Sequence, residues 1–350
     1  MNPVHRRDRR GSRSAGLAVL AMAVAVAVLT GCGSDEQSTS NGPGAEDDLR
    51  PVRVVLDWTP NTNHGGMFLA DAEGWYEEAG LDVEFIEPGD SSSLQLLAAG
   101  RADVAVSVAE EVLPARAEGL PVRSVAAIIQ HNTSSLVSLA EKGISRPRHL
   151  EGRTYGGWGG QLEQALVHQL VECDGGDPSS VKFVDVGEAD YRIGLERGQY
   201  DFVWIYDAWD GVRLAEVDGV ELNRIAFADH TDCIPDWYTP LIATSDSFAA
   251  DDATDLGLFL SVTARGYAQA MADPAAAAEA LLAVSPDLDP ELVTKSAEWL
   301  STRFVDDPDR WGAQEAEVWD SFAAFLVDAG MLEEGFDPST AWTGEFLDAG

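Results

Sequence analysis

Basic residues are scarce in this sequence. Its 350 residues include 23 Lys and Arg against 60 Asp and Glu, which gives a formal net charge of −37. A negative field of this size repels nucleic acid and anionic lipid headgroups, so neither is expected as a partner. The charge is explained either by a solvated acidic surface that favours solubility or by attraction of a cationic ligand.

The common sequence signatures of enzymes are also missing. There is no G-x-S-x-G motif, no P-loop and no Rossmann glycine pattern, and no group of Cys and His has the spacing of a zinc site. We therefore predict no catalytic residue, no metal and no cofactor. The 45% of hydrophobic residues and the ten Trp are enough to build a full core.

The apolar stretch near the N-terminus is too short to span a bilayer. Leu17 to Leu29 has 13 residues, whereas a membrane-spanning helix needs about 20. Five Arg precede it, and Thr30-Gly31-Cys32 follows it, which is typical of a secretory lipoprotein leader. We predict a signal peptide at 1–31, a lipidated Cys32, a flexible tether at 32–51 and a body anchored outside the cytoplasm. A membrane-spanning helix is the alternative.

Cysteine is nearly absent. Besides Cys32 the chain has only Cys173 and Cys233. Outside the cytoplasm such a pair can oxidise, but a disulfide needs the two Cα atoms to lie within about 7 Å. The sequence leaves a disulfide and two free thiols equally open.

Strand-like runs alternate with helical periodicity from residue 52 to about residue 244. The expected strands are 52–57, 81–86, 104–108, 125–129, 136–139, 154–156, 182–186, 202–205, 221–226 and 241–244. The helices expected between them are 66–78, 94–99, 162–173, 189–197 and 208–216, and from Leu256 onward the pattern is helical only. This alternation predicts an α/β fold of parallel-rich sheets flanked by helices, with ligand at the carboxyl ends of the strands.

Four segments of the chain carry a family resemblance. They are LDWTPNTNH at 56–64, IIQHNTS at 128–134, LEGRTYGGWG at 150–159 and WIYDAWDG at 204–211. Together they resemble the pyrimidine-binding lipoproteins of thiamine-precursor importers, in a broader family that includes the yeast-type pyrimidine synthase. The resemblance implies a two-lobed periplasmic-binding-protein-like fold (type II) that closes like a hinge. Lobe 1 would hold residues 52–148 and 240–350, and lobe 2 residues 149–239.

The first candidate site residues follow a strand of lobe 1. Asp57 and Trp58 end the first strand, and Trp58 offers a π face on which a flat heterocycle can stack. A buried core position is the alternative for Trp58. The polar run after it contributes Asn61 and His64, since polar groups behind a buried strand are costly unless they meet solvent or ligand.

An acidic candidate follows the strand that ends near Ser107. The family resemblance places an acid at Glu110, where a carboxylate would accept hydrogen bonds from the amino group of an aminopyrimidine. A solvated carboxylate at a helix start is the alternative reading of Glu110.

The glycine-rich loop of lobe 2 supplies further candidates. It reads Tyr155-Gly-Gly-Trp-Gly-Gly160 and joins a strand to a helix, so the backbone N–H groups around Gly157 and Gly159 can turn toward a polar oxygen of a ligand. Trp158 favours ring stacking over a dedicated phosphate site, and a plain tight turn is the alternative. Glu163, in the first helical turn, either contacts ligand or compensates the helix dipole.

The opposite wall of the site is expected from the strand at 202–205. Tyr206 would stack on a ligand ring, and Asp207 either caps the following helix or touches ligand. Tyr238, near the return of the chain to lobe 1, is a weaker candidate.

Two classes of function remain. One is a monomeric binding protein that captures an aminopyrimidine and passes it to the permease and ATPase subunits of an ABC importer, with riboflavin or thiamine as alternative ligands. The other is a pyrimidine synthase, whose lysine and histidine fall, by the resemblance, on Ser107 and Glu111. Serine forms no imine and glutamate lacks imidazole, so the binding protein is favoured.

Overall fold

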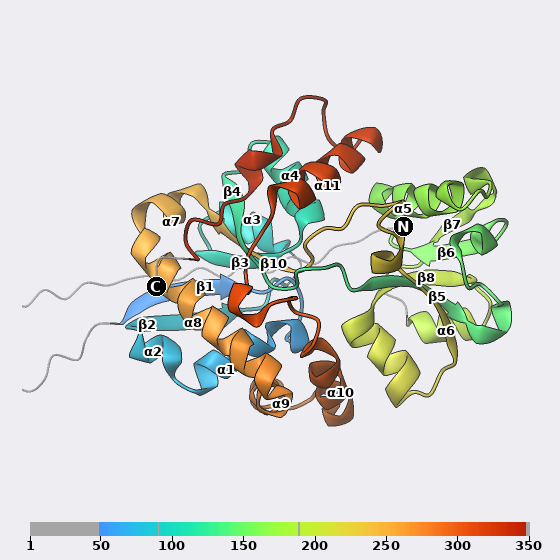
Figure 1. Ribbon diagram of the computed structural model, residues 1–350. Helices are drawn as coiled ribbons and strands as arrows, with labels where there is room; N and C mark the ends of the chain where they lie inside the picture. The colour runs from blue at the N-terminus through green and yellow to red at the C-terminus, as the bar shows by residue number, and fades with distance from the viewer. Residues whose placement is uncertain (1–48, 90, 188–189, 348–350) are drawn as a thin grey trace, which may run out of the picture. The chain divides into compact units, whose positions relative to one another are not determined.

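Two separate β-sheets organise the part of the chain that the structure describes (Figure 1). The computed structural model describes residues 49–89, 91–187 and 190–347, which belong to one compact unit. The predicted leader, the lipidation site at Cys32 and the tether up to residue 48 lie outside the described residues. No helix in those three ranges is long and apolar enough to cross a membrane.

The first sheet has the strand order β2 (Leu81–Ile86), β1 (Arg50–Val55), β3 (Val104–Ser107), β10 (Leu241–Ser245) and β4 (Val122–Ala127). Strand β1 is parallel to β2 and β3, whereas β10 is antiparallel to β3 and β4. Neighbouring side chains of β1 are buried on opposite faces, with Val54 in one core cluster and Val55 in another. Burial on both faces explains why the strand ends in two consecutive apolar residues, Val54 and Val55.

Helices cover both faces of this sheet (Figure 1). On one side lie α1 (Gly65–Ala72), α8 (Ala253–Ala272), α9 (Pro274–Val284) and α10 (Pro290–Leu300). On the other lie α3 (Ser93–Ala98), α4 (Ala109–Ala117) and α11 (Ala316–Asp328). The short helix α2 (Trp75–Glu78) contacts β2, and the short helix α7 (Asp246–Asp251) contacts β10.

The second sheet has the order β7 (Lys182–Asp185), β6 (Thr154–Gly157), β8 (Phe202–Tyr206), β5 (Ser134–Leu139) and β9 (Leu222–Ala226). Helix α5 (Gln161–Cys173) packs in the core that contains Phe202, and α6 (Tyr191–Glu196) packs in the core that contains Val203. This sheet is therefore also covered on both faces.

The chain connects the sheets twice. It leaves the first sheet after Ala127 and enters the second at Ser134, earlier than the boundary expected after residue 148, and it returns between Ala226 and Leu241. The strands that receive the chain, β5 and β10, are the antiparallel members of their sheets.

Asp236 joins the two connecting segments. Its carboxylate accepts the backbone N–H of Asn132 at 2.8 Å and lies 2.6 Å from Nδ1 of His131. This carboxylate raises the pKa of His131 to about 9. The two passages between the sheets are thus held together by one acidic side chain.

The predicted α/β class, the alternation of strands and helices and the parallel-rich sheets are confirmed. Each sheet is mixed, because β10 in the first and β5 in the second are antiparallel to their neighbours. Apolar patterning gives the position of a strand and not its direction, so these two reversals were not predicted. The helix predicted over 66–78 is two helices, α1 and α2, separated by Gly74 at φ 71°. The segment predicted as an α-helix over 208–216 consists of π-helical turns at Asp207–Gly211 and Arg213–Val217.

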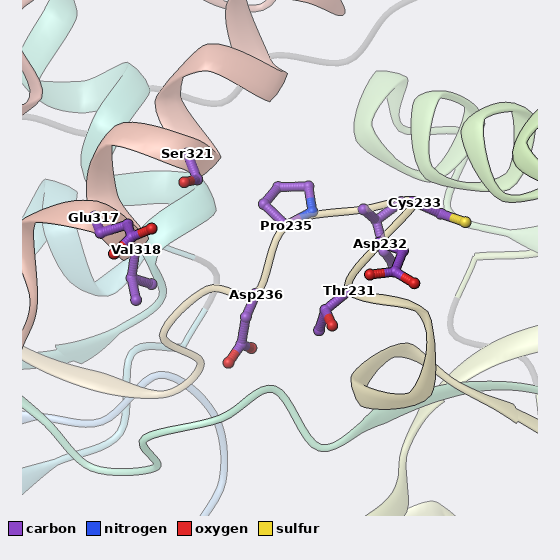
Figure 2. Close-up of a pocket in the computed structure, with 9 residues that line it drawn as sticks. Thr231, Asp232, Cys233, Pro235, Asp236, Glu317, Val318 and Ser321 are labelled. Atoms are coloured by element: carbon purple, nitrogen blue, oxygen red, sulfur yellow. The ribbon is translucent and has the colours of Figure 1, made fainter.

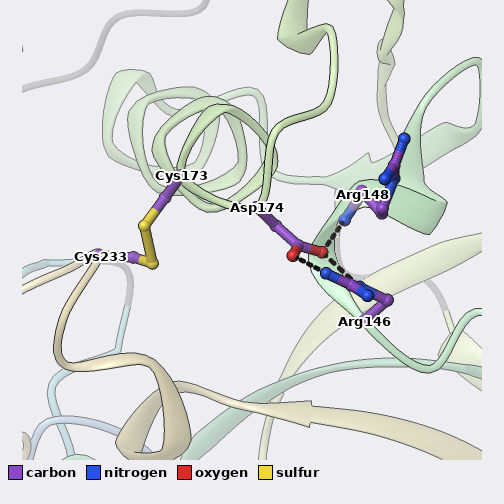
Figure 3. Close-up of a disulfide and its surroundings, with 5 residues drawn as sticks. All are labelled: Arg146, Arg148, Cys173, Asp174 and Cys233. Atoms are coloured by element: carbon purple, nitrogen blue, oxygen red, sulfur yellow. Dashed lines mark hydrogen bonds and ion pairs between the residues drawn. A yellow bond between two sulfur atoms is a disulfide. The ribbon is translucent and has the colours of Figure 1, made fainter.

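Cys173 and Cys233 form a disulfide, with their Cα atoms 5.7 Å apart (Figure 3). The bond ties the end of α5 to the return segment. The next residue, Asp174, accepts the backbone N–H of Arg148 at 2.8 Å and pairs with the guanidinium of Arg146, which lowers the pKa of Asp174. The C-terminal end of α5 is therefore attached both to the return segment and to the segment that contains Arg146 and Arg148.

Candidate ligand-binding site

A cavity of about 720 Å³ lies where the strands of both sheets end. From the first sheet it is lined by residues that follow β1 and β3 or precede β10, among them Asp57, Glu111 and Thr239. From the second sheet it is lined by Trp158 after β6 and by Tyr206 at the end of β8. The cavity thus occupies the place where open α/β sheets bind ligands.

Two indole rings dominate the lining. Trp58 is 54% exposed and Trp158 is 44% exposed, and the two come from different sheets. Large aromatic side chains are usually buried, so two half-exposed indoles in one cavity indicate a surface for a flat apolar ligand. The ring of Trp158 meets that of Tyr191 edge-on, with centroids 6.2 Å apart.

Asp57 is oriented by a buried histidine. The backbone N–H of Asn61 donates to Nδ1 of His64 at 3.2 Å, so the proton of this ring lies on Nε2, which donates to Asp57 Oδ1 at 2.7 Å. His64 is fully buried and does not line the cavity, whereas Asp57 and Asn61 do. His64 therefore acts on the site by fixing a carboxylate.

The two adjacent glutamates of α4 have different environments. Glu110 accepts the indole N–H of Trp237 at 2.9 Å and is not part of the cavity lining, although we expected it to contact ligand. Burial raises the pKa of Glu110 to about 8. Glu111 lines the cavity, and its pKa is raised by burial and by the nearby carboxylate of Asp57.

The glycine-rich loop is organised around Glu163. Its carboxylate accepts the Tyr155 hydroxyl at 2.6 Å, the backbone N–H of Trp158 at 3.1 Å and that of Gly160 at 2.7 Å. A Cβ on Gly157 would lie 2.3 Å from Glu163 Oε1, so only glycine fits there. Of the loop residues that we predicted as ligand contacts, only Trp158 lines the cavity; Tyr155, Gly157, Gly159 and Glu163 do not.

The loop therefore offers little to an anionic ligand. Two of its backbone N–H groups already donate to a carboxylate of the protein itself, and a second anion placed beside them would be repelled. The loop positions the indole of Trp158.

Of the remaining predicted residues, one lines the cavity and two are buried in the protein. Tyr206 lines the cavity. Asp207 is buried behind it, where it accepts the Ser135 hydroxyl at 2.6 Å and lies 3.3 Å from Arg224. Tyr238 is buried against Trp319, and its hydroxyl accepts the backbone N–H of Glu315 at 2.7 Å. Asp207 and Tyr238 thus have structural partners and lie outside the lining.

One wall of the cavity was not predicted from the sequence. It is built by the π-helical turns and by the start of α6, and its members are Ala208, Trp209, Asp210, Arg213, Leu214, Asp218, Asp190, Tyr191 and Arg192. Burial raises the pKa of Asp210 to about 6. Arg192 lies 3.4 Å from Asp218 and 2.8 Å from Glu196, so its charge is balanced.

Carboxylates outnumber guanidiniums in the lining. Among the described residues of the lining, five carry carboxyl groups and two are arginines; the acids are Asp57, Glu111, Asp190, Asp210 and Asp218. An acidic, aromatic cavity favours a planar ligand with N–H donors over an inorganic anion. In the described ranges, no three or more His, Cys, Asp or Glu side chains are grouped so that they could hold a metal ion.

A second cavity, of about 310 Å³, lies beside the return segment (Figure 2). Residues from Thr231 to Asp236 line one side of it, and Glu317, Val318 and Ser321 of α11 line the other. Among the described residues that line this cavity, none is aromatic and none is a predicted site residue.

The family model described as "NMT1/THI5 like" matches residues 61–277. The chain belongs to this family. The NMT1/THI5-like chain is 25% identical over 323 residues to the formylaminopyrimidine-binding protein of Halalkalibacterium halodurans. The aligned region covers 90% of this chain and 94% of that protein. The chain is 24% identical over 306 residues to the 4-amino-5-hydroxymethyl-2-methylpyrimidine phosphate synthase of Legionella pneumophila, covering 85% and 92%.

Solved structures with the same fold extend the comparison. The periplasmic aliphatic sulphonate binding protein SsuA of Escherichia coli matches with a TM-score of 0.66 at 15% identity, covering 83% of this chain and 91% of that one. The Candida albicans CA3427 gene product, described as having the generic periplasmic binding protein fold, matches with a TM-score of 0.60 at 18% identity, covering 85% and 97%. The predicted periplasmic-binding-protein fold of this NMT1/THI5-like chain is thereby confirmed.

Proposed function

We propose that this protein is the solute-binding component of an ABC importer and that it captures a pyrimidine precursor of thiamine. The ligand is N-formyl-4-amino-5-aminomethyl-2-methylpyrimidine or the related hydroxymethylpyrimidine. The proposal is supported by the similarity to the formylaminopyrimidine-binding protein over most of both chains. It needs no cofactor, and the protein acts as a monomer.

The observation that carries the proposal is the pair of half-exposed indoles in an acidic cavity. Trp58 and Trp158 offer faces for a flat ring, and Asp57 and Glu111 offer acceptors for its amino group. A hydrogen bond to a charged acceptor contributes about 1.5–3 kcal/mol, and an aromatic contact about 0.5–1.5 kcal/mol beyond area burial. These contacts favour an aminopyrimidine over a ligand that lacks the flat ring or the amino group.

The positions that the synthase resemblance assigns to a lysine and a histidine both line the cavity. They are Ser107 and Glu111 here. Serine cannot hold pyridoxal phosphate as an imine, and glutamate cannot donate imidazole atoms to a new ring. We therefore favour binding over synthesis, even though several relatives are named as synthases.

The protein's place in the cell follows from the same proposal. The lipid anchor at Cys32 would hold the binding domain outside the cytoplasm, next to the permease and ATPase subunits that receive the ligand. Attachment is through the anchor alone.

The test is to unfold protein purified without added ligand and to identify the released molecule by mass spectrometry. Calorimetric titration of ligand-free protein with the formylaminopyrimidine, hydroxymethylpyrimidine, thiamine and riboflavin follows. Tightest binding of either pyrimidine supports the proposal. Tighter binding of thiamine or riboflavin, for which the cavity has room, would overturn the choice of ligand.

A further inference from the structure

Two buried hydroxyl groups in the lining of the cavity have no hydrogen-bond partner among the described residues. They belong to Ser107, which is 1% exposed, and Thr239, which is 2% exposed. A buried hydroxyl without a partner destabilises a fold, because it loses its hydrogen bonds to water and gains none in return. Two such groups in one cavity call for a role that compensates this cost.

The fold places these two hydroxyls on neighbouring strand ends. Ser107 is the last residue of β3 and pairs with Leu241 of the antiparallel strand β10. Thr239 precedes β10 by two residues, and the backbone N–H of Ala109 donates to the Tyr238 carbonyl at 3.0 Å, which continues the pairing. Both residues therefore stand at the same edge of the sheet, where the cavity opens.

Each hydroxyl has a distinct neighbour in the lining. Ser107 lies near the carboxyl group of Glu111 and partly offsets the rise in the pKa of that group. Thr239 lies near the hydroxyl of Tyr206 and partly offsets the rise in the pKa of Tyr206. Neither pair forms a hydrogen bond within 3.5 Å. Both hydroxyl oxygens are shielded in this conformation, so binding of a ligand to them requires the neighbouring side chains of Glu111 and Tyr206 to move.

We propose that Ser107 and Thr239 read the two ring nitrogens of the ligand, each hydroxyl donating to one nitrogen while Glu111 accepts from the adjacent amino group. This inference rests on the proposed function. A pyrimidine ring presents two acceptors, and the two hydroxyls are two donors. A ring with one nitrogen, or with none, would leave a buried hydroxyl unpaired and would be rejected.

The sign of the effect on stability separates this role from a structural one. Removing a hydroxyl that has no partner leaves the melting temperature of the ligand-free protein unchanged or higher. Removing one that has a partner lowers it. Thr244→Val is the matched control, because Thr244 lies on β10, is fully buried and donates to the Asp103 carbonyl at 2.8 Å.

The experiment measures calorimetric affinity for the formylaminopyrimidine and the melting temperature of ligand-free Ser107→Ala, Thr239→Val and Thr244→Val proteins. We expect the first two variants to bind at least about tenfold more weakly without a loss of melting temperature. Thr244→Val is expected to melt at a lower temperature and to retain wild-type affinity. A pyridine analogue, in which one ring nitrogen of the pyrimidine is replaced by carbon, completes a double-mutant cycle. The variant that lacks the hydroxyl facing that nitrogen should bind the analogue as tightly as the wild-type protein does.

Two failures are distinguishable. If the wild-type protein does not bind the pyrimidine, the proposed function is overturned and this inference falls with it. If the wild-type protein binds but Ser107→Ala and Thr239→Val retain full affinity, or melt at a lower temperature as Thr244→Val does, the hydroxyls are structural and only this inference is overturned.

Discussion

The backbone N–H of Trp158 donates to the carboxylate of Glu163 at 3.1 Å. Trp158 lines the cavity, whereas Glu163 is buried behind the loop and accepts two further hydrogen bonds there. An anion of the protein itself thus occupies the loop that a phosphate would otherwise use. The loop is built to position an aromatic ring.

Removing Glu163's charge should loosen this loop. In Glu163→Gln one of the three donors faces an amide N–H₂ group, so we expect a loss of about 1–3 kcal/mol in the free energy of unfolding and weaker ligand binding. Urea unfolding and calorimetry measure both. Glu172→Gln is the control, because Glu172 lies exposed on the same helix. Equal stability of the two variants would show that the hydrogen bonds of Glu163 contribute nothing.

Truncation of either indole in the cavity should reduce affinity. We expect Trp58→Ala and Trp158→Ala each to weaken binding of the formylaminopyrimidine by at least about tenfold, or roughly 1.4 kcal/mol. Because both rings are about half exposed, the melting temperature without ligand should change little. Trp299→Ala is the control, since Trp299 lies under Arg303 and does not line the cavity. Calorimetry that finds the three variants equally tight would remove both indoles from the site.

Stability should fall as the pH rises, in part because of Glu110. Its pKa in the folded protein, about 8, exceeds the ordinary value of 4.5, so the unfolded chain loses this proton at lower pH than the folded protein does. The stabilisation is fully present below about pH 4.5 and is lost as the pH approaches about 8. Partial exposure of Glu110 reduces the effect, which we put at about 1 kcal/mol or more.

Glu110→Gln keeps an oxygen that accepts the indole N–H of Trp237 and removes the titration. The difference in melting temperature between pH 5 and pH 8 should therefore be smaller in this variant than in the wild-type protein, by roughly 2 °C or more. Asp207 and Asp210, whose pKa values burial raises to about 6, contribute equally to both proteins. An identical pH dependence in the two proteins would contradict the assignment.

The disulfide should stabilise the second lobe and its connection to the return segment. Its two cysteines are 60 residues apart in the sequence, a loop for which a disulfide typically contributes about 2–4 kcal/mol. Cys173→Ser combined with Cys233→Ser, and reduction of the wild-type protein, should lower the free energy of unfolding by the same amount. Urea denaturation with and without reductant measures it, and insensitivity to reductant would argue that the bond is absent.

The proposed anchor is testable by cell fractionation. Cys32→Ser should release the protein from the membrane into the soluble extracytoplasmic fraction, since no acyl chain can then be attached. Retention of the variant in the membrane fraction would count against lipidation at Cys32.

The sequence located the site better than it assigned the side chains. Trp58, Trp158 and Tyr206 were predictable, because ligands of α/β sheets lie at the carboxyl ends of strands and each residue follows or ends one. The sequence did not show whether Glu110 or Glu111 faces the cavity. The two are adjacent on a helix that the strand pattern did not predict, so only packing decides which one lines the cavity.

Other features had weaker signals. The capping of the glycine-rich loop by Glu163 has a readable cue, a glutamate three residues after the residue that precedes the helix. The wall formed by the π-helical turns has none, because apolar periodicity does not distinguish an α-helix from π-helical turns over so short a segment. The direction of β5 and β10 likewise depends on how the chain connects the sheets.

The most direct test of this account is a crystal structure of the protein bound to the formylaminopyrimidine. The account predicts the ring against the indoles of Trp58 and Trp158, with its amino group within hydrogen-bond distance of Glu111 or Asp57. A ring bound elsewhere, for example in the cavity between the return segment and α11, would contradict it.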